Sequence, residues 1–319
     1  MSSAPKYSVV VPVYNRPQEV EELLASLARQ TYTRFEVVLI EDGSTLTSET
    51  VFEKYSSQLR LQYFFKPNSG PGPSRNFGFA KARGEYMVIF DSDCIIPDHY
   101  FEAVEKALAE FAFDAWGGPD RGHQNFTPLQ QAMGYTMSSI LTTGGIRGGK
   151  KHVGWFQPRS FNMGIRRQVY EATGGFRFDR YAEDIEFSIR MKDAGFKVGL
   201  IPEAYVFHKR RTSLSQFYKQ VFNFGRGRIM VGRLHKGMVK LTHWFPTVFT
   251  SGMLCTPLLW IISDHLFMTA VLIYASYFTA IAMDAFRVTR SLSVALLSIP
   301  SAFIQMVGYG LGFLKEKLK

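Results

Sequence analysis

The stretch Met87-Val88-Ile89-Phe90-Asp91-Ser92-Asp93 joins a short apolar run to two acidic residues. The apolar run predicts a buried β-strand. Because side chains alternate in direction along an extended chain, Asp91 and Asp93 are expected to point the same way beyond its end. Two carboxylates so placed are hard oxygen ligands for Mg²⁺ or Mn²⁺, which take further ligands from water and substrate phosphates. Taken alone, such a pair is more often two solvated charges at a strand end. The neighbouring motifs must therefore show whether Asp91 and Asp93 form a metal site.

Apolar and amphipathic segments alternate through the first two hundred residues. We expect strands at residues 7–13, 35–40, 61–65 and 197–201, and helices at residues 17–30, 48–55, 74–83 and 182–194. Strands that alternate with helices at this spacing predict an α/β fold with a Rossmann-like, mostly parallel sheet flanked by helices. Ligands of such sheets bind at the carboxyl ends of the strands, where the acidic motif is expected to lie.

Two polar clusters follow the first two predicted strands. In Val11-Pro12-Val13-Tyr14-Asn15, the ring of Tyr14 is positioned to lie flat against a nucleobase. In Glu41-Asp42-Gly43-Ser44, a carboxylate can accept hydrogen bonds from a base or a ribose, and the glycine allows close backbone approach. An ordinary loop aromatic and a simple Asp-Gly turn would look the same.

Two further clusters open predicted helices. Gly70-Pro71-Gly72-Pro73-Ser74-Arg75 is a rigid turn, and the helix N-terminus together with Arg75 favours phosphate. Glu183-Asp184 begins a helix about ninety residues after the acidic motif. Asp184 is a candidate general base whose basicity the neighbouring charge of Glu183 would raise, although acids in a first helical turn are commonly there to stabilise the helix dipole.

The charge of the chain is unevenly distributed. Its 319 residues are 46% apolar and carry a net charge of +10, yet residues 1–203 are nearly neutral. Between Ala204 and Ser263 there is no acidic residue, while Lys209, Arg210, Arg211, Lys219, Arg226, Arg228, Arg233, Lys236 and Lys240 are basic. A basic stretch before apolar segments favours a membrane surface over nucleic acid, with a solvated basic face as the alternative.

Three apolar segments follow, at residues 244–262, 266–283 and 292–313, each approaching the ~20 residues that cross a bilayer core. We therefore expect a catalytic domain at 1–210, a basic juxtamembrane or interfacial segment at 211–243 and membrane-associated helices at 244–319. Three full spans would place the basic tail at 315–319 outside, against the charge rule, so one segment is alternatively interfacial or re-entrant. The remaining interpretation is that the three apolar segments are buried helices of a soluble domain.

Other features are less informative. Cys94 and Cys255 predict neither a disulfide framework nor a zinc site. The N-terminus lacks a hydrophobic signal region, so we expect the first two hundred residues in the cytoplasm, at the inner or plasma membrane. Residues 117–160 are rich in glycine and predict a mobile loop over the site, most strongly at Gly144–Lys151.

The ordered set of motifs resembles family 2 glycosyltransferases over about residues 6–210. The resemblance is carried by Val11-Pro12-Val13-Tyr14-Asn15, Glu41-Asp42-Gly43-Ser44, Gly72-Pro73-Ser74-Arg75-Asn76-Phe77-Gly78, Asp91-Ser92-Asp93, Asn162-Met163-Gly164, Gly174-Gly175-Phe176 and Glu183-Asp184.

That resemblance implies a GT-A fold and transfer of a sugar, with inversion, from a nucleotide diphosphate donor that is usually UDP-linked. Tyr14 and Asp42 would contact the uridine, Asp91 and Asp93 would serve ribose or Mn²⁺ or Mg²⁺, Asp184 would deprotonate the acceptor, and His208 would approach the metal. The residues expected at the donor are Pro12, Tyr14, Asn15, Asp42, Arg75, Asn76, Asp91, Ser92, Asn162 and Glu183.

The implied acceptor is a saccharide, either free or linked to a polyprenyl or other lipid. The implied process is synthesis of the cell envelope or of an exopolysaccharide. Processive members of the family carry Gln-x-x-Arg-Trp, which residues 220–228 do not match, so a hexosyltransferase adding single sugars is favoured. Two alternatives remain. A phosphoryl-transfer enzyme with Asp91 as nucleophile is disfavoured by the late position of the motif. A catalytically silent, membrane-tethered nucleotide-binding subunit is disfavoured by the presence of Asp91, Asp93 and Asp184.

Overall fold

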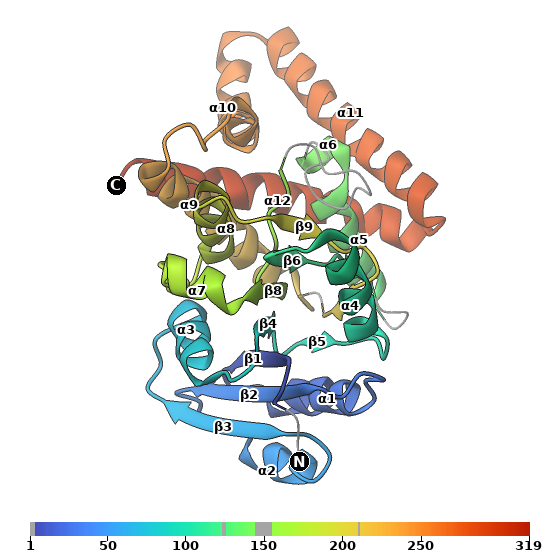
Figure 1. The fold of residues 1–319 in the computed structure, drawn as a ribbon. Coiled ribbons are helices and arrows are strands. Elements are labelled where there is room, and N and C mark those ends of the chain that lie inside the picture. The colour runs from blue at the N-terminus through green and yellow to red at the C-terminus, as the bar shows by residue number, and fades with distance from the viewer. Residues whose placement is uncertain (1–3, 123–125, 144–154, 210) are drawn as a thin grey trace. The chain divides into compact units, whose positions relative to one another are not determined.

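The computed structural model describes residues 4–122, 126–143, 155–209 and 211–319 (Figure 1). The chain forms two compact units. The first comprises residues 1–123 and 154–209, and the second comprises residues 124–153 and 210–319. Each unit is described by itself.

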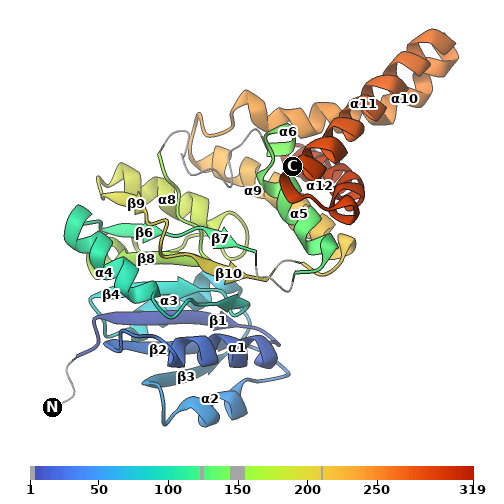
Figure 2. The ribbon, with the colours of Figure 1, turned by 90° about the vertical axis from the view of Figure 1, so that its right-hand side faces the viewer.

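A seven-stranded sheet forms the centre of the first unit, with the strand order β3-β2-β1-β4-β8-β6-β9 (Figure 2). Strands β3, β2, β1 and β4 are parallel to one another, whereas β8 is antiparallel to both β4 and β6. The strands are β1 (Tyr7–Val13), β2 (Phe35–Asp42), β3 (Leu61–Lys66), β4 (Tyr86–Phe90), β6 (Ala115–Gly117), β8 (Asn162–Arg166) and β9 (Val198–Leu200). The mostly parallel sheet expected from the sequence is confirmed.

Helices cover both faces of this sheet because its central strands are apolar on both sides. Val9 and Val11 of β1 pack in one cluster with side chains of α1, α2 and α4, whereas Val10 packs in another with side chains of α3, α7 and α8. The helices are α1 (Pro17–Ala28), α2 (Glu49–Tyr55), α3 (Pro71–Lys81), α4 (Tyr100–Phe111), α7 (Arg167–Thr173) and α8 (Glu183–Asp193).

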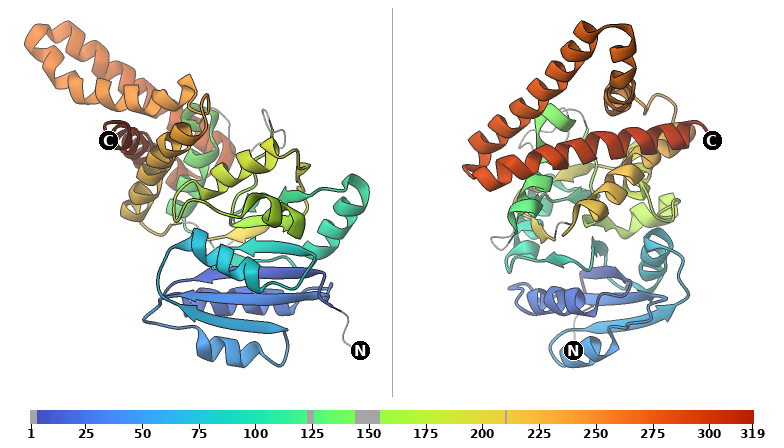
Figure 3. Two further views of the ribbon diagram at one scale, coloured as in Figure 1. Left: turned by 60° about the vertical axis from the view of Figure 1, so that its left-hand side comes forward. Right: turned by 180° about the vertical axis from the view of Figure 1, so that it is seen from behind.

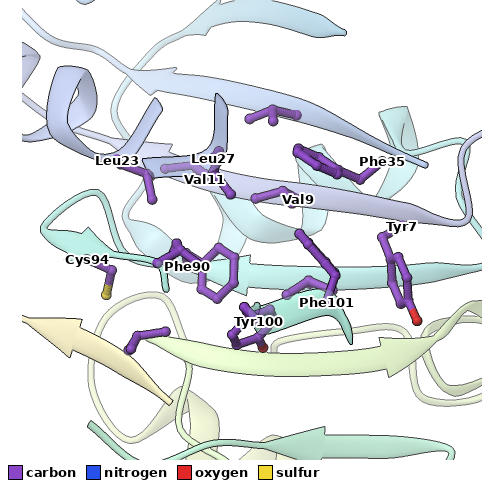
Figure 4. Close-up of a cluster of buried hydrophobic side chains, with 14 of the residues drawn as sticks. Tyr7, Val9, Val11, Leu23, Leu27, Phe35, Phe90, Cys94, Tyr100 and Phe101 are labelled. Carbon is purple, nitrogen blue, oxygen red and sulfur yellow. The ribbon is translucent and has the colours of Figure 1, made fainter. Parts of the chain in front are cut away.

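Aromatic rings fill the core between β1 and α4 (Figure 4). Tyr7 and Phe101 are fully buried with ring centroids 5.0 Å apart, and Phe35 stacks on Phe101 at the same separation. Phe90, the last residue of β4, meets Tyr100 edge-on at 5.1 Å. Burial of each such ring stabilises the fold by about 1.5–3 kcal/mol, which holds the end of β4 in a fixed position.

A smaller sheet lies at the end of β4. Its strand order is β5-β10-β7, with β5 at Cys94–Ile95, β7 at Asp120–Arg121 and β10 at Val206–His208. Because β5 and β10 are antiparallel and His208 pairs with Cys94, this sheet brings His208 to the acidic motif.

The predicted strands and helices are found where the apolar residues follow a single strand or helix pattern. The strands at 7–13, 35–40, 61–65 and 197–201, and the helices at 17–30, 48–55, 74–83 and 182–194, are found within a few residues of their predicted ends. The mobile loop predicted over 117–160 is wrong for residues 128–143, which form α5 (Pro128–Ser138) and α6 (Ile140–Thr143). The Thr127 hydroxyl and the Gln130 side chain cap α5 reciprocally, a sequence signal for a helix start. Gly144–Lys151 lies outside the described residues.

The second unit is helical. Besides α5 and α6 it contains α9 (Leu214–Leu234), the 3₁₀ turn η1 (Leu241–Trp244), α10 (Phe245–Ile262), α11 (Asp264–Thr289) and α12 (Leu292–Lys317) (Figure 3). Among the described residues, three helical stretches are long and apolar enough to cross a membrane: Leu241–Ile262, Asp264–Thr289 and Leu292–Lys317. The three predicted apolar segments are therefore helices of the expected length.

Glycines bring α9 and α12 into close contact. A Cβ atom on Gly312 would lie 2.0 Å from the carbonyl oxygen of Phe222, and one on Gly225 would lie 2.2 Å from the carbonyl oxygen of Tyr309. A Cβ atom on Gly308, one turn before Gly312, would lie 2.7 Å from the Cγ2 methyl group of Val221. Small residues four apart let two helix backbones approach each other, as in helix pairs within membranes.

We expect Gly312→Leu to destabilise the second unit by about 3 kcal/mol, because the added side chain would have to displace the backbone of α9. Thermal unfolding of the full chain in detergent would measure the loss. Ser293→Leu is the matched control, since Ser293 is exposed near the start of the same helix. Equal stability of Gly312→Leu and the control would contradict close packing of α9 on α12.

Candidate active site

The carboxyl ends of β1, β2 and β4 meet at one edge of the main sheet, because these strands are parallel neighbours. Three loops that the sequence singled out start there: Tyr14–Arg16 after β1, Gly43–Ser44 after β2 and Asp91–Asp93 after β4. The predicted cluster of polar residues is thus assembled by the order of the strands.

Asp93 is a buried residue of this cluster, with only 6% of its surface exposed. One carboxylate oxygen accepts a hydrogen bond from Arg16 Nη1 at 2.7 Å, and the other lies 3.1 Å from His208 Nε2. The backbone carbonyl of Asp93 accepts a hydrogen bond from Lys209 N at 3.0 Å. An arginine and a histidine side chain therefore flank this carboxylate.

The state of His208 follows from the same contact. Burial lowers the pKa of His208, but the neighbouring Asp93 carboxylate raises it by more, so the net shift is upward. The ring stacks on Phe161 with centroids 4.9 Å apart, and its Nδ1 has no hydrogen-bond partner among the described residues. His208 Nε2 thus faces the Asp93 carboxylate, whose negative charge favours the protonated form of the imidazole.

Asp93, Cys94 and His208 offer ligand atoms that all lie within 4.8 Å of one another. Cys94 is the poorest of the three as a ligand: burial, followed by the charges of Asp93 and Asp91, raises the pKa of its thiol well above the usual value. Its Sγ points to the carbonyl of Phe161 at 3.6 Å. A carboxylate and an imidazole remain, a donor set that fits a divalent ion whose other ligands are water and phosphate oxygens.

Asp91 is held by a different cation. Arg75, on α3, is 3% exposed, and its guanidinium donates from Nη2 to Asp91 Oδ1 at 2.8 Å and from Nη1 to Glu183 Oε1 at 2.9 Å. The guanidinium carbon also lies 5.4 Å from the centre of the Phe176 ring. Arg75 thus joins the motif after β4 to the start of α8.

Glu183 is a buried acid with an unusual pKa. Burial raises it and the Asp184 charge adds to this, while Arg75 only partly offsets them, so the pKa rises to about 7. Ser160 Oγ lies 3.3 Å from the same oxygen that Arg75 contacts.

A pH dependence of stability follows from this shift. Because the folded pKa of Glu183 lies above its unfolded value, its favourable contribution is present below about pH 4.5 and is lost as the pH rises through about 7. We expect the free energy of unfolding of the wild type to fall, relative to that of Glu183→Gln, by on the order of 3 kcal/mol over this range.

Unfolding in detergent at a series of pH values would measure the difference. The control is Glu203→Gln, at an exposed position, which should leave the pH profile unchanged. Parallel profiles of the wild type and Glu183→Gln would contradict the raised pKa.

Asp184 stands in the first turn of α8, where the helix dipole favours a carboxylate. Its side chain is 16% exposed, and Arg159 Nη1 lies 3.5 Å from Oδ2. The other oxygen accepts a hydrogen bond from Ile185 N at 2.8 Å. A partly accessible carboxylate is therefore held next to the Arg75–Glu183 pair.

The loop after β1 combines one exposed ring with an anchored neighbour. Tyr14 is 53% exposed and available for stacking. Asn15 has a positive φ of 54°, and its side-chain oxygen accepts hydrogen bonds from the backbone N–H groups of Thr45 and Leu46, both at 2.9 Å. Pro12 is a half-buried residue of β1.

Asp42, the last residue of β2, organises the loop before α3. Its carboxylate accepts hydrogen bonds from Ser69 N and Gly70 N, both at 2.9 Å, and from Lys66 Nζ. Burial raises the pKa of Asp42, but Lys66 and these backbone donors lower it by more. Gly70, with φ at +96°, allows the turn that presents its N–H.

Asn76 and Asn162, two of the three predicted asparagines, make hydrogen bonds within the first unit. Asn76 exchanges two hydrogen bonds of 2.8 Å with the backbone of Phe176. Asn162 is fully buried, accepts from Tyr100 Oη at 2.7 Å and donates to Ala204 O at 2.8 Å. Ser92 is buried between Asp91 and Asp93. These side chains hold the loops of the site in place.

Two basic residues of the site were missed by the sequence analysis. Arg16 directly follows Tyr14-Asn15 in a loop already assigned to the site, so its position was a usable signal. Arg159 precedes the strand β8, and its sequence context carries no comparable signal.

The sequence matches two family models. Residues 8–174 match the model for glycosyl transferase family 2, and residues 157–283 match that for glycosyl transferase family group 2.

Curated relatives are similar over shorter stretches. An uncharacterized glycosyltransferase of Rickettsia bellii is 37% identical over 34% of this chain and 16% of its own length. The poly(ribitol-phosphate) β-N-acetylglucosaminyltransferase TarS of Staphylococcus aureus is 44% identical over 28% of this chain and 16% of its own, and the uncharacterized glycosyltransferase EpsJ of Bacillus subtilis is 26% identical over 66% and 63%. The chain thus spans about a sixth of the length of the first of these relatives.

Solved structures share the fold. The mannosyltransferase PcManGT of Pyrobaculum calidifontis, in complex with GDP-Man and Mn²⁺, has a TM-score of 0.67 at 18% identity, over 95% of this chain and 87% of that one. Residues 1–349 of S. aureus TarS give a TM-score of 0.54 at 22% identity, over 94% of this chain and 90% of that one. The architecture is GT-A-like, as the sequence motifs implied.

Proposed function

Because the chain belongs to glycosyl transferase family 2, we propose that it transfers a sugar from a nucleotide diphosphate donor to a hydroxyl group of an acceptor. The observation that carries this proposal is the surrounding of Asp93 by Arg16 and His208 at the carboxyl edge of the sheet. A carboxylate and an imidazole at this edge can hold a divalent ion once Arg16 leaves Asp93, and the ion and the released guanidinium both favour a diphosphate.

Asp93 and His208 are the residues that would hold Mn²⁺ or Mg²⁺, and the fit of their ligand atoms supports this assignment. When bound, the ion supplies charge stabilisation for the departing nucleoside diphosphate. Arg16 occupies one oxygen of Asp93 in the ligand-free protein, so we expect it to exchange this partner for the donor phosphates when the ion binds. Asp91, which is paired with Arg75, is expected to contact the donor ribose or the ion.

We assign Asp184 as the general base for a single displacement with inversion. A general base must lie within hydrogen-bond reach of the proton that it takes, and Asp184 is the more accessible member of the Glu183-Asp184 pair. Glu183 is buried against Arg75, so its role is to position that arginine.

A UDP-sugar is the proposed donor. Tyr14 is exposed for stacking on the base, and Asp42 with Asn15 shapes the loops expected to contact the uridine. The TarS structure solved with UDP-GlcNAc has a TM-score of 0.53 to this chain, which makes UDP-linked hexoses the first donors to test.

The proposed acceptor is a saccharide or a polyprenyl- or lipid-linked saccharide used in cell-envelope or exopolysaccharide synthesis. The apolar helices of the second unit support an acceptor presented at the membrane. The catalytic unit is proposed to lie on the cytoplasmic side. Residues 220–228 form part of α9 and lack the Gln-x-x-Arg-Trp pattern, which supports addition of single sugars.

The test is release of nucleoside diphosphate by the detergent-purified full chain from a panel of UDP- and GDP-sugars, with Mn²⁺, Mg²⁺ or chelator. Release from one donor that chelator abolishes is the expected result. Nucleotide binding to the same samples is measured by calorimetry. Binding without release in the presence of lipid-linked acceptors would favour a silent subunit, and absence of binding to every donor would overturn the proposal.

A further inference from the structure

Helices α10 and α11 form an apolar hairpin whose side chains are mostly exposed. Their most apolar windows are 17% and 6% buried, and no Lys or Arg occurs between Lys240 and Arg287. With 18 and 26 residues, they are roughly 27 Å and 39 Å long, against a bilayer core of about 30 Å. Tyr274 Oη of α11 donates to the carbonyl of Phe249 in α10 at 2.9 Å, which ties the two helices together.

The C-terminal half of α12 contacts the first turns of α10. The rings of Trp244 and Phe313 are 4.8 Å apart, and Thr250 Oγ1 donates to the carbonyl of Met306 at 3.2 Å. A Cβ atom on Gly310 would lie 2.6 Å from the carbonyl oxygen of Pro246. This half of α12 therefore lies at the open end of the hairpin, opposite its tip at Ser263–His265.

The N-terminal half of α12 contacts the last turns of α11. Ile281 and Ala285 of α11 form one buried cluster with Ala295 and Ala302 of α12. A short turn at Arg290, with φ at +56°, joins the two helices. Since both halves of α12 meet the open end of the hairpin, α12 crosses beneath it, as Figures 1 and 3 show. A third antiparallel span would instead end near the tip.

Charge pairs tie the end of α12 to α9. Glu316 has a side chain only 6% exposed and contacts Arg226 Nε at 2.9 Å and Arg233 Nη1 at 3.0 Å. Lys319 Nζ lies 3.7 Å from the same carboxylate. One acid thus meets three bases, and the excess positive charge lies beside α9, which precedes the hairpin in sequence.

The outer face of α12 is apolar. Its window is 50% buried, far more than those of α10 and α11, and its exposed large side chains recur at helical spacing. These are Leu292 (65% exposed), Leu296 (57%) and Phe303 (41%), and Leu318 (84%) directly follows the helix. A helix with one face on protein and the other apolar and exposed is suited to lie in the plane of a membrane surface.

We infer that the α10–α11 hairpin crosses the bilayer, and that α12 lies flat in the interface on the side of α9. Lys319 is then on the same side as the catalytic unit, since no candidate span among the described residues precedes α10. The basic residues at Arg226, Arg233, Arg287, Arg290 and Lys315 face anionic headgroups on that side, which agrees with the positive-inside rule. This topology is independent of the chemistry of the first unit.

Cysteine labelling of the full chain in intact bacterial cells tests the topology. Exposed Cys255 is replaced by Ser, and buried Cys94 is kept. Single cysteines are then introduced as Ser57→Cys in the catalytic unit, His265→Cys at the hairpin tip and Leu318→Cys at the end of α12, all at exposed positions. A membrane-impermeant maleimide is applied before and after lysis.

The expected result is labelling of His265→Cys in intact cells, and of Ser57→Cys and Leu318→Cys only after lysis. Labelling of Leu318→Cys from outside would overturn the inference in favour of three spans. Failure to label His265→Cys from outside would overturn the crossing of the hairpin. Fusion of green fluorescent protein or alkaline phosphatase after Lys319 gives a second measurement without substitutions. Fluorescence without phosphatase activity is expected, and the reverse pattern contradicts the topology.

Discussion

Asp93→Ala is expected to lower sugar transfer by about 10³-fold or more, because stabilisation of the leaving diphosphate by a metal ion is worth several kcal/mol. The substitution removes the only carboxylate in the group formed with Cys94 and His208. It also leaves Arg16 and His208 facing each other without the charge that now separates them. Initial rates with the donor identified in the release assay would measure the loss.

Two controls separate loss of the site from loss of the fold. Asp98 lies five residues after Asp93, and its exposed carboxylate pairs with Arg29. Asp98→Ala should therefore retain full activity. Binding of Mn²⁺, followed by its paramagnetic resonance, should weaken in Asp93→Ala and remain unchanged in Asp98→Ala. Wild-type turnover in Asp93→Ala would remove this residue from the proposed metal site.

Asp184→Asn is expected to retain donor binding and to lose transfer by about 10²- to 10⁴-fold, the range that general base catalysis contributes. The amide keeps the size of the side chain and its place in the first turn of α8 but cannot accept the acceptor proton. Arg159, 3.5 Å away, would lose an ionic partner at a partly exposed position, so the effect on folding is expected to be small.

The measurement is a pair of titrations: donor affinity by calorimetry, and transfer rate at saturating donor and acceptor. Asp193→Asn, at the exposed end of the same helix, is the matched control. If donor affinity fell in proportion to the rate, Asp184 would be a binding residue. If the rate were unchanged, another group would have to serve as the base.

The ion pairs suggest why both arginines belong to the site. Each carboxylate of the Asp91-Ser92-Asp93 motif has its own guanidinium, Arg75 for the first and Arg16 for the second. Arg75 is enclosed and shared with Glu183, whereas the Arg16 side chain is 36% exposed. Arg75 is therefore suited to hold the loop in place, and Arg16 is the one free to move.

The sequence predicted the sheet because the apolar runs of β1, β2 and β4 are unbroken and the helices between them are strongly periodic. It also predicted which loops meet, since parallel strands place their carboxyl ends at one edge. Two of the motifs that carry the resemblance to family 2 glycosyltransferases make packing contacts within the fold. In Asn162-Met163-Gly164, a Cβ on the glycine would lie 2.1 Å from the Trp116 ring, and in Gly174-Gly175-Phe176, the backbone of Phe176 binds Asn76.

Hydropathy alone predicted three segments of nearly membrane-spanning length, at residues 244–262, 266–283 and 292–313, because length and apolar content are local properties. It could not assign their roles, because an apolar residue that meets lipid and one that meets protein contribute equally to a hydropathy sum. The Gly308–Gly312 spacing in α12 was a local signal for close helix packing, and the Thr127–Gln130 cap was one for α5.

The pairing of charges was decided only by the tertiary structure. Arg16 is 77 residues from Asp93 and Arg75 is 108 residues from Glu183, so no local pattern couples them. The upward pKa shift of Glu183 likewise comes from burial, which depends on packing of the whole first unit. Sequence determined which acids and bases the site contains, and folding decided which of them meet, because electrostatic energies depend on distance and burial in space rather than on separation along the chain.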